Sequence, residues 1–331
     1  MINNEKKLLL NETIKNDYSN ITGLIILKNG EIQYENYFQG FKKDEMIHVA
    51  SVAKSITSIL IGIAIDNGYI HSVEDNILNY FPEVKLTKRN EVIKQITIKD
   101  LLTMRVPYKC KYEPYTKVYS SDDWVLTTLN LIGGKGKIGD FRYLTAGVQI
   151  LSGIIRKTTG LSLREFANQY LFEKLSIAEK EKFTINSKEE HLAYIKERGV
   201  AKGWIEDKNG VSTGGWGIPL TVEEMSKIGQ LCLNKGIYKG QRIVSESWLK
   251  ESISNSKEVS LFGKTFQYGY YWWIIDDLKY PTINALGNSG NVICCIPKLN
   301  LVIAIASSFY PRAKDRLEFI NNYIIPIFER D

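Results

Sequence analysis

The start of the chain combines two apolar runs with a tight turn. Residues 23–28 and 31–38 flank the dipeptide Asn29-Gly30. Asn and Gly tolerate the positive φ angles that a two-residue hairpin turn requires at both positions. Residues 1–20 are more polar and are expected to form a helix or an arm. The pattern therefore predicts a β-hairpin near the N-terminus.

Apolar residues recur at three- and four-residue spacing through the middle of the chain, which is typical of helices. Capping residues precede several of these stretches, including Thr97, Ser162 and the pair Thr221 and Glu224, which forms a capping-box pattern. The predicted helices span residues 51–67, 98–104, 122–131, 146–159, 162–172, 221–233 and 245–253.

The C-terminal part returns to strand patterns before a last amphipathic helix at 312–329. The predicted strands span residues 268–275, 282–286, 292–296 and 301–307. An isolated hairpin is only marginally stable. We therefore expect an α/β (α+β) fold in which both chain ends build one five-stranded antiparallel sheet flanked by helices.

The order of these elements also predicts a division into two lobes. Residues 1–60 and 261–331 are expected to form a discontinuous sheet lobe, and residues 61–260 a mostly helical insertion. A cleft would then open between the sheet and the helices. Residues 105–121 and 176–213 are expected to line that cleft.

Composition narrows the range of partners. The 331 residues are 44% hydrophobic and 24% charged, with a formal net charge of +6. The basic residues are scattered, so we expect a small-molecule substrate and no nucleic acid. The apolar run at 59–65 is too short to cross a membrane, and the first residues lack a signal-peptide core. These features favour a cytoplasmic protein without a membrane partner, and they leave the oligomeric state open.

Cysteine and histidine spacing does not favour a metal site. Cys294 and Cys295 are adjacent, so on a strand they would point to opposite faces. The other cysteines, Cys110 and Cys232, are isolated, and the three histidines do not share ligand spacing. We expect free thiols, which fit a reducing compartment, and no metal or other cofactor.

The sharpest candidate for chemistry is Ser51-Val52-Ala53-Lys54 at the start of a strongly apolar helix. Residues three apart share one helix face, so the hydroxyl of Ser51 and the amine of Lys54 can meet. Burial lowers the pKa of a lysine, which lets it accept a proton from a hydroxyl. The helix N-terminus favours a developing oxyanion. The alternative is that Ser51 is an ordinary N-cap.

Several blocks of the chain, in order, carry a resemblance to a known superfamily. They are residues 48–55 with 61–66, residues 96–104, Phe141-Arg142-Tyr143 with the helix to Gly160, residues 214–217 with 221–225, and residues 268–273 with 287–290. Together they resemble the serine β-lactamase and penicillin-binding protein superfamily, and most closely its class C-like branch of esterases and amidohydrolases. The resemblance runs from about residue 20 to the end.

This resemblance implies roles for individual residues. Ser51 would be the nucleophile, Lys54 its proton acceptor, and Tyr143 the phenol that activates Ser51 or protonates the leaving group. Neighbouring donors are expected to lower the pKa of that phenol. The backbone N–H groups of Ser51 and Asn291 would form the oxyanion hole. The positions expected against the substrate are Thr145, Trp216, Asn288, Ser289 and Gly290.

Two positions depart from the family pattern. Thr145 stands where the second motif usually has Asn, and Asn288 stands where the third usually has Lys or His. Asn288 offers hydrogen bonds but no positive charge for a substrate carboxylate. We therefore expect a hydrolase of small esters or amides. The alternatives are a weak or inactive ligand-binding protein of the same fold, and a β-lactamase or D-alanyl-D-alanine carboxypeptidase.

Residues 134–139 match the pattern Gly-x-Gly-x-x-Gly, but they lack the preceding strand and the following helix that a nucleotide-binding site requires.

Overall fold

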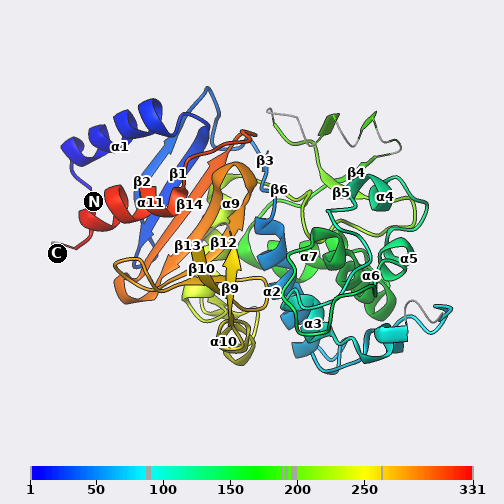
Figure 1. The fold of residues 1–331 in the computed structure, drawn as a ribbon. Helices are drawn as coiled ribbons and strands as arrows, with labels where there is room; N and C mark the ends of the chain where they lie inside the picture. Colours follow the sequence, from blue (N-terminus) through cyan, green and yellow to red (C-terminus); the bar gives the residue numbers. More distant parts are fainter. Residues whose placement is uncertain are drawn as a thin grey trace.

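The computed structural model describes residues 2–86, 91–185, 187, 189–190, 193–194, 200–261 and 264–329. In this part of the chain, eight antiparallel strands form one sheet in the order β2-β1-β14-β13-β12-β11-β10-β9 (Figure 1). The strands are β1 (Ile21–Lys28), β2 (Glu31–Tyr37), β9 (Lys257–Leu261), β10 (Lys264–Tyr268), β11 (Trp273–Ile275), β12 (Thr282–Gly287), β13 (Asn291–Ile296) and β14 (Leu301–Ser307).

The predicted hairpin and the joining of both chain ends are confirmed. Asn29 and Gly30 have φ angles of 54° and 81°, as a tight two-residue turn requires. β1 pairs with β2 on one side and with β14 on the other, with Lys28 opposite Leu301. The expected count of five strands was too low. All six predicted strand segments contribute to the sheet, the aromatic-rich segment near residue 270 forms two short strands, and a further strand, β9, precedes it.

Helices cover both faces of the sheet. One face packs against α1 (Asn4–Asp17) and the C-terminal helix, which begins with α11 (Arg316–Phe319). The other face packs against α2 (Val52–Asp66) and α9 (Val222–Leu233). Cys294 packs in the apolar core between the sheet and α1, and Cys295 packs in the core on the face covered by α2 and α9. The prediction that they point to opposite faces is confirmed.

Several helices of the described residues gather beside α2, on the side away from the sheet (Figure 1). They are α3 (Ile98–Leu102), α4 (Tyr115–Tyr119), α5 (Trp124–Leu129), α6 (Val148–Thr159) and α7 (Leu163–Ala167). α10 (Glu246–Ser254) contacts α2 from the other side, below β9 and β10 in this view. The helix predicted at 162–172 changes to a π-helical turn after Ala167. α9 packs on β13 and β14 although it lies within the range assigned to the helical lobe. The two-lobe division stays a prediction.

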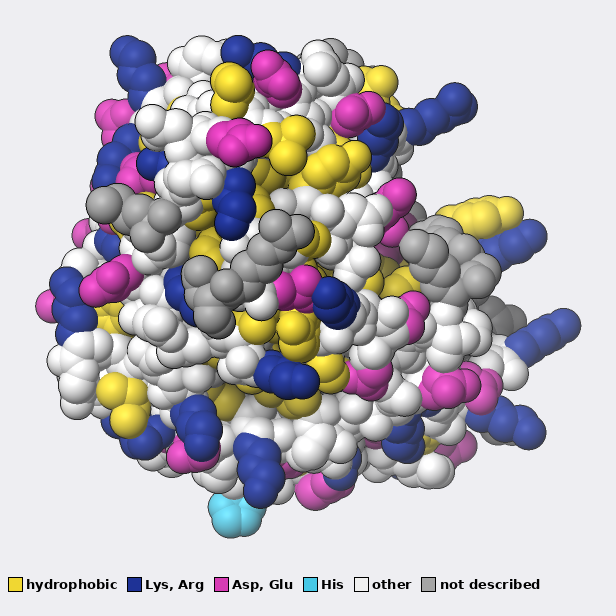
Figure 2. Space-filling model, turned by 90° about the vertical axis from the view of Figure 1, so that its left-hand side faces the viewer, with side chains coloured by type: hydrophobic (Ala, Val, Ile, Leu, Met, Phe, Trp, Pro, Cys, Tyr) yellow, Lys and Arg dark blue, Asp and Glu magenta, His cyan; other side chains and the backbone are white. Residues whose placement is uncertain are grey.

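Charges of both signs are interspersed over the face drawn in Figure 2, where basic side chains do not merge into a continuous surface. This agrees with the scattered charge pattern of the sequence. Within the described residues, no helix is both long and apolar enough to span a membrane.

Candidate active site

A strained turn positions Ser51 at the start of α2. The short strand β3 (Ile47–His48) pairs with β6 (Pro219–Leu220), which fixes the chain entering the turn. Ala50 then adopts a φ of 50°, a conformation that costs energy for a residue with a side chain and that is enriched at functional sites. The Ser51 side chain makes no capping hydrogen bond to the helix. The ordinary N-cap alternative therefore does not describe Ser51.

Lys54 lies beneath this turn with only 1% of its surface exposed. Its Nζ is 2.7 Å from Ser51 Oγ and 3.0 Å from the carbonyl oxygen of Gly215. Burial lowers the pKa of Lys54 to about 7, against the opposing effect of the Glu113 carboxylate. A large fraction of the amine is therefore neutral near pH 7, and a neutral amine can accept a proton.

Tyr143 completes the cluster from a distant part of the sequence. Backbone N–H of Arg142 donates to the Met104 carbonyl, which anchors the segment before η3 (Thr145–Gly147). The Tyr143 ring lies 4.9 Å from Lys54 Nζ, and its hydroxyl is hydrogen-bonded to Ser51. The hydroxyl, the amine and the phenol thus converge, as the sequence analysis predicted.

The expected effect on the pKa of Tyr143 is wrong. Burial raises the pKa of this phenol well above its ordinary range, and the hydrogen bond with Ser51 only partly opposes that rise. The phenol loses more from the removal of water than it gains from its neighbours. Tyr143 is therefore neutral at ordinary pH, and Lys54 is the member of the cluster that titrates near pH 7.

The end of β12 closes the other side of the nucleophile turn. A Cβ atom built on Gly287 would lie 2.5 Å from the Val49 carbonyl oxygen and 3.3 Å from Ala50 Cβ, so only glycine fits this approach. Asn288, which is exposed, follows directly. Asn291 pairs with Gly287 in the β12–β13 ladder. Its side chain donates to the Asn288 carbonyl and accepts from the Ser307 N–H.

Ser289 and Gly290 are turned toward the C-terminal segment. Ser289 Oγ accepts from the Tyr310 N–H at 2.9 Å, and its carbonyl accepts from Asn20 at 2.7 Å. Gly290 packs against the Arg316 guanidinium. These contacts shape the β12–β13 turn beside Gly287, and substrate contacts by Ser289 and Gly290 stay predictions.

Thr145 and Trp216 lie on the helical side of the site. Thr145 is buried at the start of η3, and its carbonyl and methyl group contact Gly215. Trp216 is buried with its ring 4.9 Å from that of Tyr119 and 5.8 Å from that of His48. A role for either residue in substrate binding stays a prediction.

Comparison with known proteins agrees with this arrangement. Residues 20–321 match the Beta-lactamase family. The chain belongs to the Beta-lactamase family. This confirms the resemblance drawn from the motifs, and the fold expected from it.

The proteins similar to this Beta-lactamase family chain include one named as a hydrolase and one named as a carboxylesterase. It is 24% identical over 311 residues to the 6-aminohexanoate-dimer hydrolase of Paenarthrobacter ureafaciens, covering 86% of this chain and 72% of the relative. A family VIII carboxylesterase has a similar fold, with a TM-score of 0.73, 14% identity, and 98% and 96% of the two chains covered. A penicillin-binding protein homologue from Caulobacter crescentus gives a TM-score of 0.69, 12% identity, and coverage of 92% and 91%.

The candidate site of this chain contains a carboxylate, Glu113, that the sequence analysis did not single out. Glu113 accepts backbone hydrogen bonds from Thr145 and, at 3.4 Å, from Ala146. Glu113 lies within the stretch 105–121 that was expected to line the cleft. No periodicity marks it, because its place depends on a loop that folds back onto residues far along the chain.

His48 supports the turn beside the nucleophile. Its Nε2 accepts from the Gly217 N–H at 2.7 Å, which places the proton of the neutral ring on Nδ1. Burial, with a further contribution from Lys54, lowers the pKa of His48 to about 4. The neutral ring ties β3 to the glycine turn whose Gly215 carbonyl accepts from Lys54. His48 therefore has a structural role beside the nucleophile turn.

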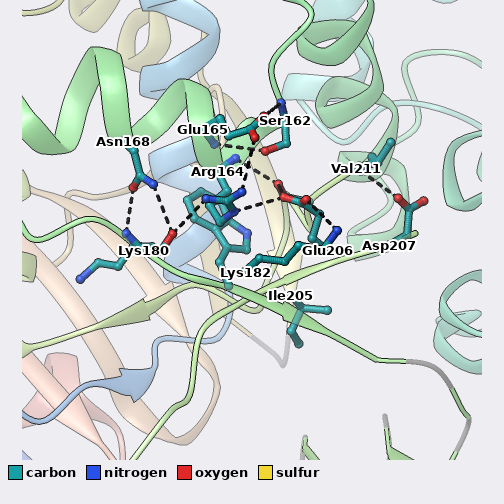
Figure 3. Close-up of polar contacts among 12 residues, drawn as sticks. Ser162, Arg164, Glu165, Asn168, Lys180, Lys182, Ile205, Glu206, Asp207 and Val211 are labelled. Carbon is teal, nitrogen blue, oxygen red and sulfur yellow. Dashed lines mark hydrogen bonds and ion pairs between the residues drawn. The ribbon is translucent and has the colours of Figure 1, made fainter. Parts of the chain in front are cut away.

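The described part of residues 176–213 forms a polar network of its own (Figure 3). Arg164 Nε lies 3.3 Å from the buried Glu206 carboxylate, and Arg164 also donates to the Lys180 carbonyl. Lys182 contacts the other Glu206 oxygen at 3.3 Å. This network fastens β4 (Lys182–Thr184) and β5 (Trp204–Glu206) to the start of α7.

Proposed function

We propose that this chain is a serine hydrolase that cleaves small esters or amides through an acyl-enzyme on Ser51. The neutral Lys54 amine takes the Ser51 proton as Oγ bonds to the carbonyl carbon. That proton passes through the Tyr143 hydroxyl to the leaving oxygen or nitrogen as its bond to the carbonyl breaks. Water then attacks the acyl group, gives up a proton to the same pair, and releases the acid with Ser51 restored.

The observation that carries the proposal is that Lys54 lies within hydrogen-bonding distance of Ser51 and has a lowered pKa. Its Nζ is 2.7 Å from Ser51 Oγ, within the reach needed for proton transfer. Burial lowers the pKa of Lys54 to about 7, close to the pH at which a general base works best. Tyr143, which is neutral, suits a relay that accepts one proton while donating another.

The oxyanion would be held by two backbone N–H groups. Ser51 supplies one from the start of α2, where the helix dipole adds a favourable field. For the second we favour Asn288 over the predicted Asn291, because Gly287 brings the end of β12 against Val49 and Ala50 and Asn288 is the next residue. The Asn291 side chain supports this choice, because it donates to the Asn288 carbonyl and so helps to hold the turn in place.

Esters and amides that lack a carboxylate are the substrate class that these residues favour. Asn288 lacks the positive charge that the β-lactamase and carboxypeptidase alternatives need for a substrate carboxylate. Relatives that bear the names 6-aminohexanoate-dimer hydrolase and family VIII carboxylesterase point to amide and ester bonds. The alternative of an inactive ligand-binding protein would require that the assembled cluster has lost turnover.

The test is covalent labelling with a fluorophosphonate, followed by peptide mass spectrometry. The wild type should gain one adduct on Ser51, and Ser51→Ala should gain none. Ser58→Ala is a matched control, because Ser58 is buried on the same helix. Hydrolysis of p-nitrophenyl esters should be lost in Ser51→Ala and kept in Ser58→Ala. A wild type that is neither labelled nor active on esters or anilides would favour the inactive alternative.

A further inference from the structure

Glu113 is a half-buried carboxylate with a fixed orientation. Its two oxygens accept backbone N–H groups of Thr145 and Ala146, at the start of the chain segment that leads into α6. Backbone N–H groups at a helix start are the usual partners of a capping carboxylate. Capping alone would account for these two bonds. It does not account for the groups that the carboxylate faces.

The negative charge of Glu113 acts on the catalytic cluster from close range. It raises the pKa values of Lys54 on α2 and of Tyr143 on the segment before η3. The other titratable groups within its electrostatic reach are Tyr108, Cys110, Tyr115 and Tyr119. The nearby Arg142 guanidinium donates to the Tyr108 and Cys110 carbonyls. Glu113 therefore gives the site a negative charge beside the reacting atoms.

The side chains of Tyr115 and Tyr119 lie within the electrostatic reach of this carboxylate. The Tyr115 and Tyr119 rings are stacked with centroids 6.0 Å apart, and the edge of Trp216 meets Tyr115 at 6.1 Å. Ring faces attract cations through their quadrupole, and a carboxylate adds a charge–charge attraction. A carboxylate next to aromatic rings is a favourable environment for an ammonium group and an unfavourable one for a carboxylate.

We propose that Glu113 is a specificity-determining residue that binds an alkylammonium group on the substrate, next to the carbonyl that Ser51 attacks. This inference rests on the proposed function and names its substrate class. It also accounts for Asn288 at the position where the family usually has Lys or His. A substrate that carries an ammonium group needs a carboxylate in the site, and it does not need a cation at position 288.

Binding of butyltrimethylammonium, followed by tryptophan fluorescence, tests the inference without turnover. Glu113→Gln keeps an oxygen for the backbone N–H groups and removes the charge. We expect it to raise the Kd of butyltrimethylammonium about tenfold, the scale of one interaction with a charged group. Glu91→Gln is the matched control, because Glu91 is exposed and paired with Lys94 on the surface. Its Kd should equal that of the wild type.

A salt series on the wild type covers the case in which Glu113→Gln does not fold. Raising ionic strength from about 0.02 M to about 0.5 M should weaken binding severalfold through screening. The neutral isostere 2,2-dimethylhexane measures the contribution of shape. Equal affinity of Glu113→Gln and wild type, or a Kd that salt does not change, would overturn the inference.

Turnover separates this inference from the proposed function. The p-nitrophenyl esters of 4-(trimethylammonio)butanoate and of its carbon isostere 5,5-dimethylhexanoate differ only in charge. We expect wild-type kcat/KM to favour the cationic ester about tenfold, and Glu113→Gln to bring the ratio near one while hydrolysing the neutral ester. Equal wild-type rates with intact Ser51 labelling would refute the role of Glu113 alone. Cation binding without labelling would refute the proposed function alone.

Discussion

The ionisation of Lys54 should set the pH dependence of the reaction. Burial lowers its pKa to about 7, and only the neutral amine can accept the Ser51 proton. We therefore expect kcat/KM for a neutral ester to rise with pH through an apparent pKa near 7 and then level off. Tyr143 stays protonated over this range because burial raises its pKa. Initial rates from pH 5 to 9 measure the curve, and a flat profile would exclude Lys54 as the base.

Glu113 should shift that same curve. Its charge favours protonated Lys54, so Glu113→Gln should lower the apparent pKa and move the rising limb to lower pH. The ester of 5,5-dimethylhexanoate is the suitable substrate, because it carries no charge of its own. An unchanged midpoint in Glu113→Gln, with the fold intact, would show that the carboxylate does not act on Lys54.

The buried amine should also cost stability. An unfolded lysine titrates near its ordinary pKa of about 10.4. Because the folded pKa is about 7, the unfolded state binds more protons between these values, and stability rises with pH across that window. Lys54→Met should abolish activity and raise the free energy of unfolding by on the order of 1 kcal/mol at pH 6. The gain should shrink toward pH 10. Urea denaturation at both pH values measures it.

The residues that the sequence identified are those with local signals. Ser51 and Lys54 share a helix face, and Tyr143 stands in a recognisable motif. Glu113 carries no such signal, because it becomes part of the site only when its loop meets Thr145. The pKa of Tyr143 was mispredicted for a related reason, since the degree of burial follows from how distant segments pack.

At the scale of elements, the β12–β13 turn should depend on Asn20. Asn20 donates to the Ser289 and Ser308 carbonyls and accepts from Arg316, so it joins the start of β1 to this turn. Asn20→Ala should misplace the Asn288 N–H and lower kcat about tenfold, part of the 10²–10³ that loss of an oxyanion donor costs. KM should change little.

Asn36→Ala is the matched control for Asn20→Ala. Asn36 donates to Asn11 at 2.7 Å on the other side of β1, away from the turn. Asn20→Ala removes three side-chain hydrogen bonds and Asn36→Ala removes two, so the melting temperature should fall in both variants, and further in Asn20→Ala. Only Asn20→Ala should slow phosphonate labelling of Ser51. Equal labelling rates in the two variants would limit Asn20 to a structural role.

Elements with strong periodic patterns were predicted well, and short ones were not. The α2 helix and strands β1, β13 and β14 lie within a residue or two of their predicted bounds. The π-helical turn after α7 and the short strands β3 and β6 escaped prediction. Each of these is fixed by partners far away in sequence, as His48 is by Gly217.

At the scale of the whole molecule, the first and last parts of the described chain pack against each other. β1 is paired with β14, and Lys6 on α1 donates to the Ile327 carbonyl at 3.2 Å. The two ends lie side by side at one edge of the molecule (Figure 1). The proposed active site combines residues near 50, 113, 143 and 288, none of which lies near either end of the chain. Moving the chain ends to another exposed loop should therefore leave the site intact.

A circular permutant tests this view of the fold. Residues 2 and 329, the outermost described residues, would be joined through a flexible Gly/Ser linker of about eight residues. New ends would open at Lys239-Gly240, the exposed tip of the hairpin between β7 (Ile237–Tyr238) and β8 (Gln241–Arg242). Exposed loop tips tolerate such cuts. We expect a cooperatively folded protein whose kcat/KM for a neutral ester lies within about threefold of wild type, because the cut breaks no contact of the cluster.

A second permutant, opened between Ser289 and Gly290, provides the contrast. It keeps the same linker and the same strand pairs, but it frees the turn that Asn20 and Arg316 hold. The sheet should still form, since β12 and β13 each keep a second neighbour in β11 and β14. Activity should fall at least as far as in Asn20→Ala, because the Asn288 N–H loses its fixed position. Full activity in this permutant would mean that the turn does not hold the oxyanion.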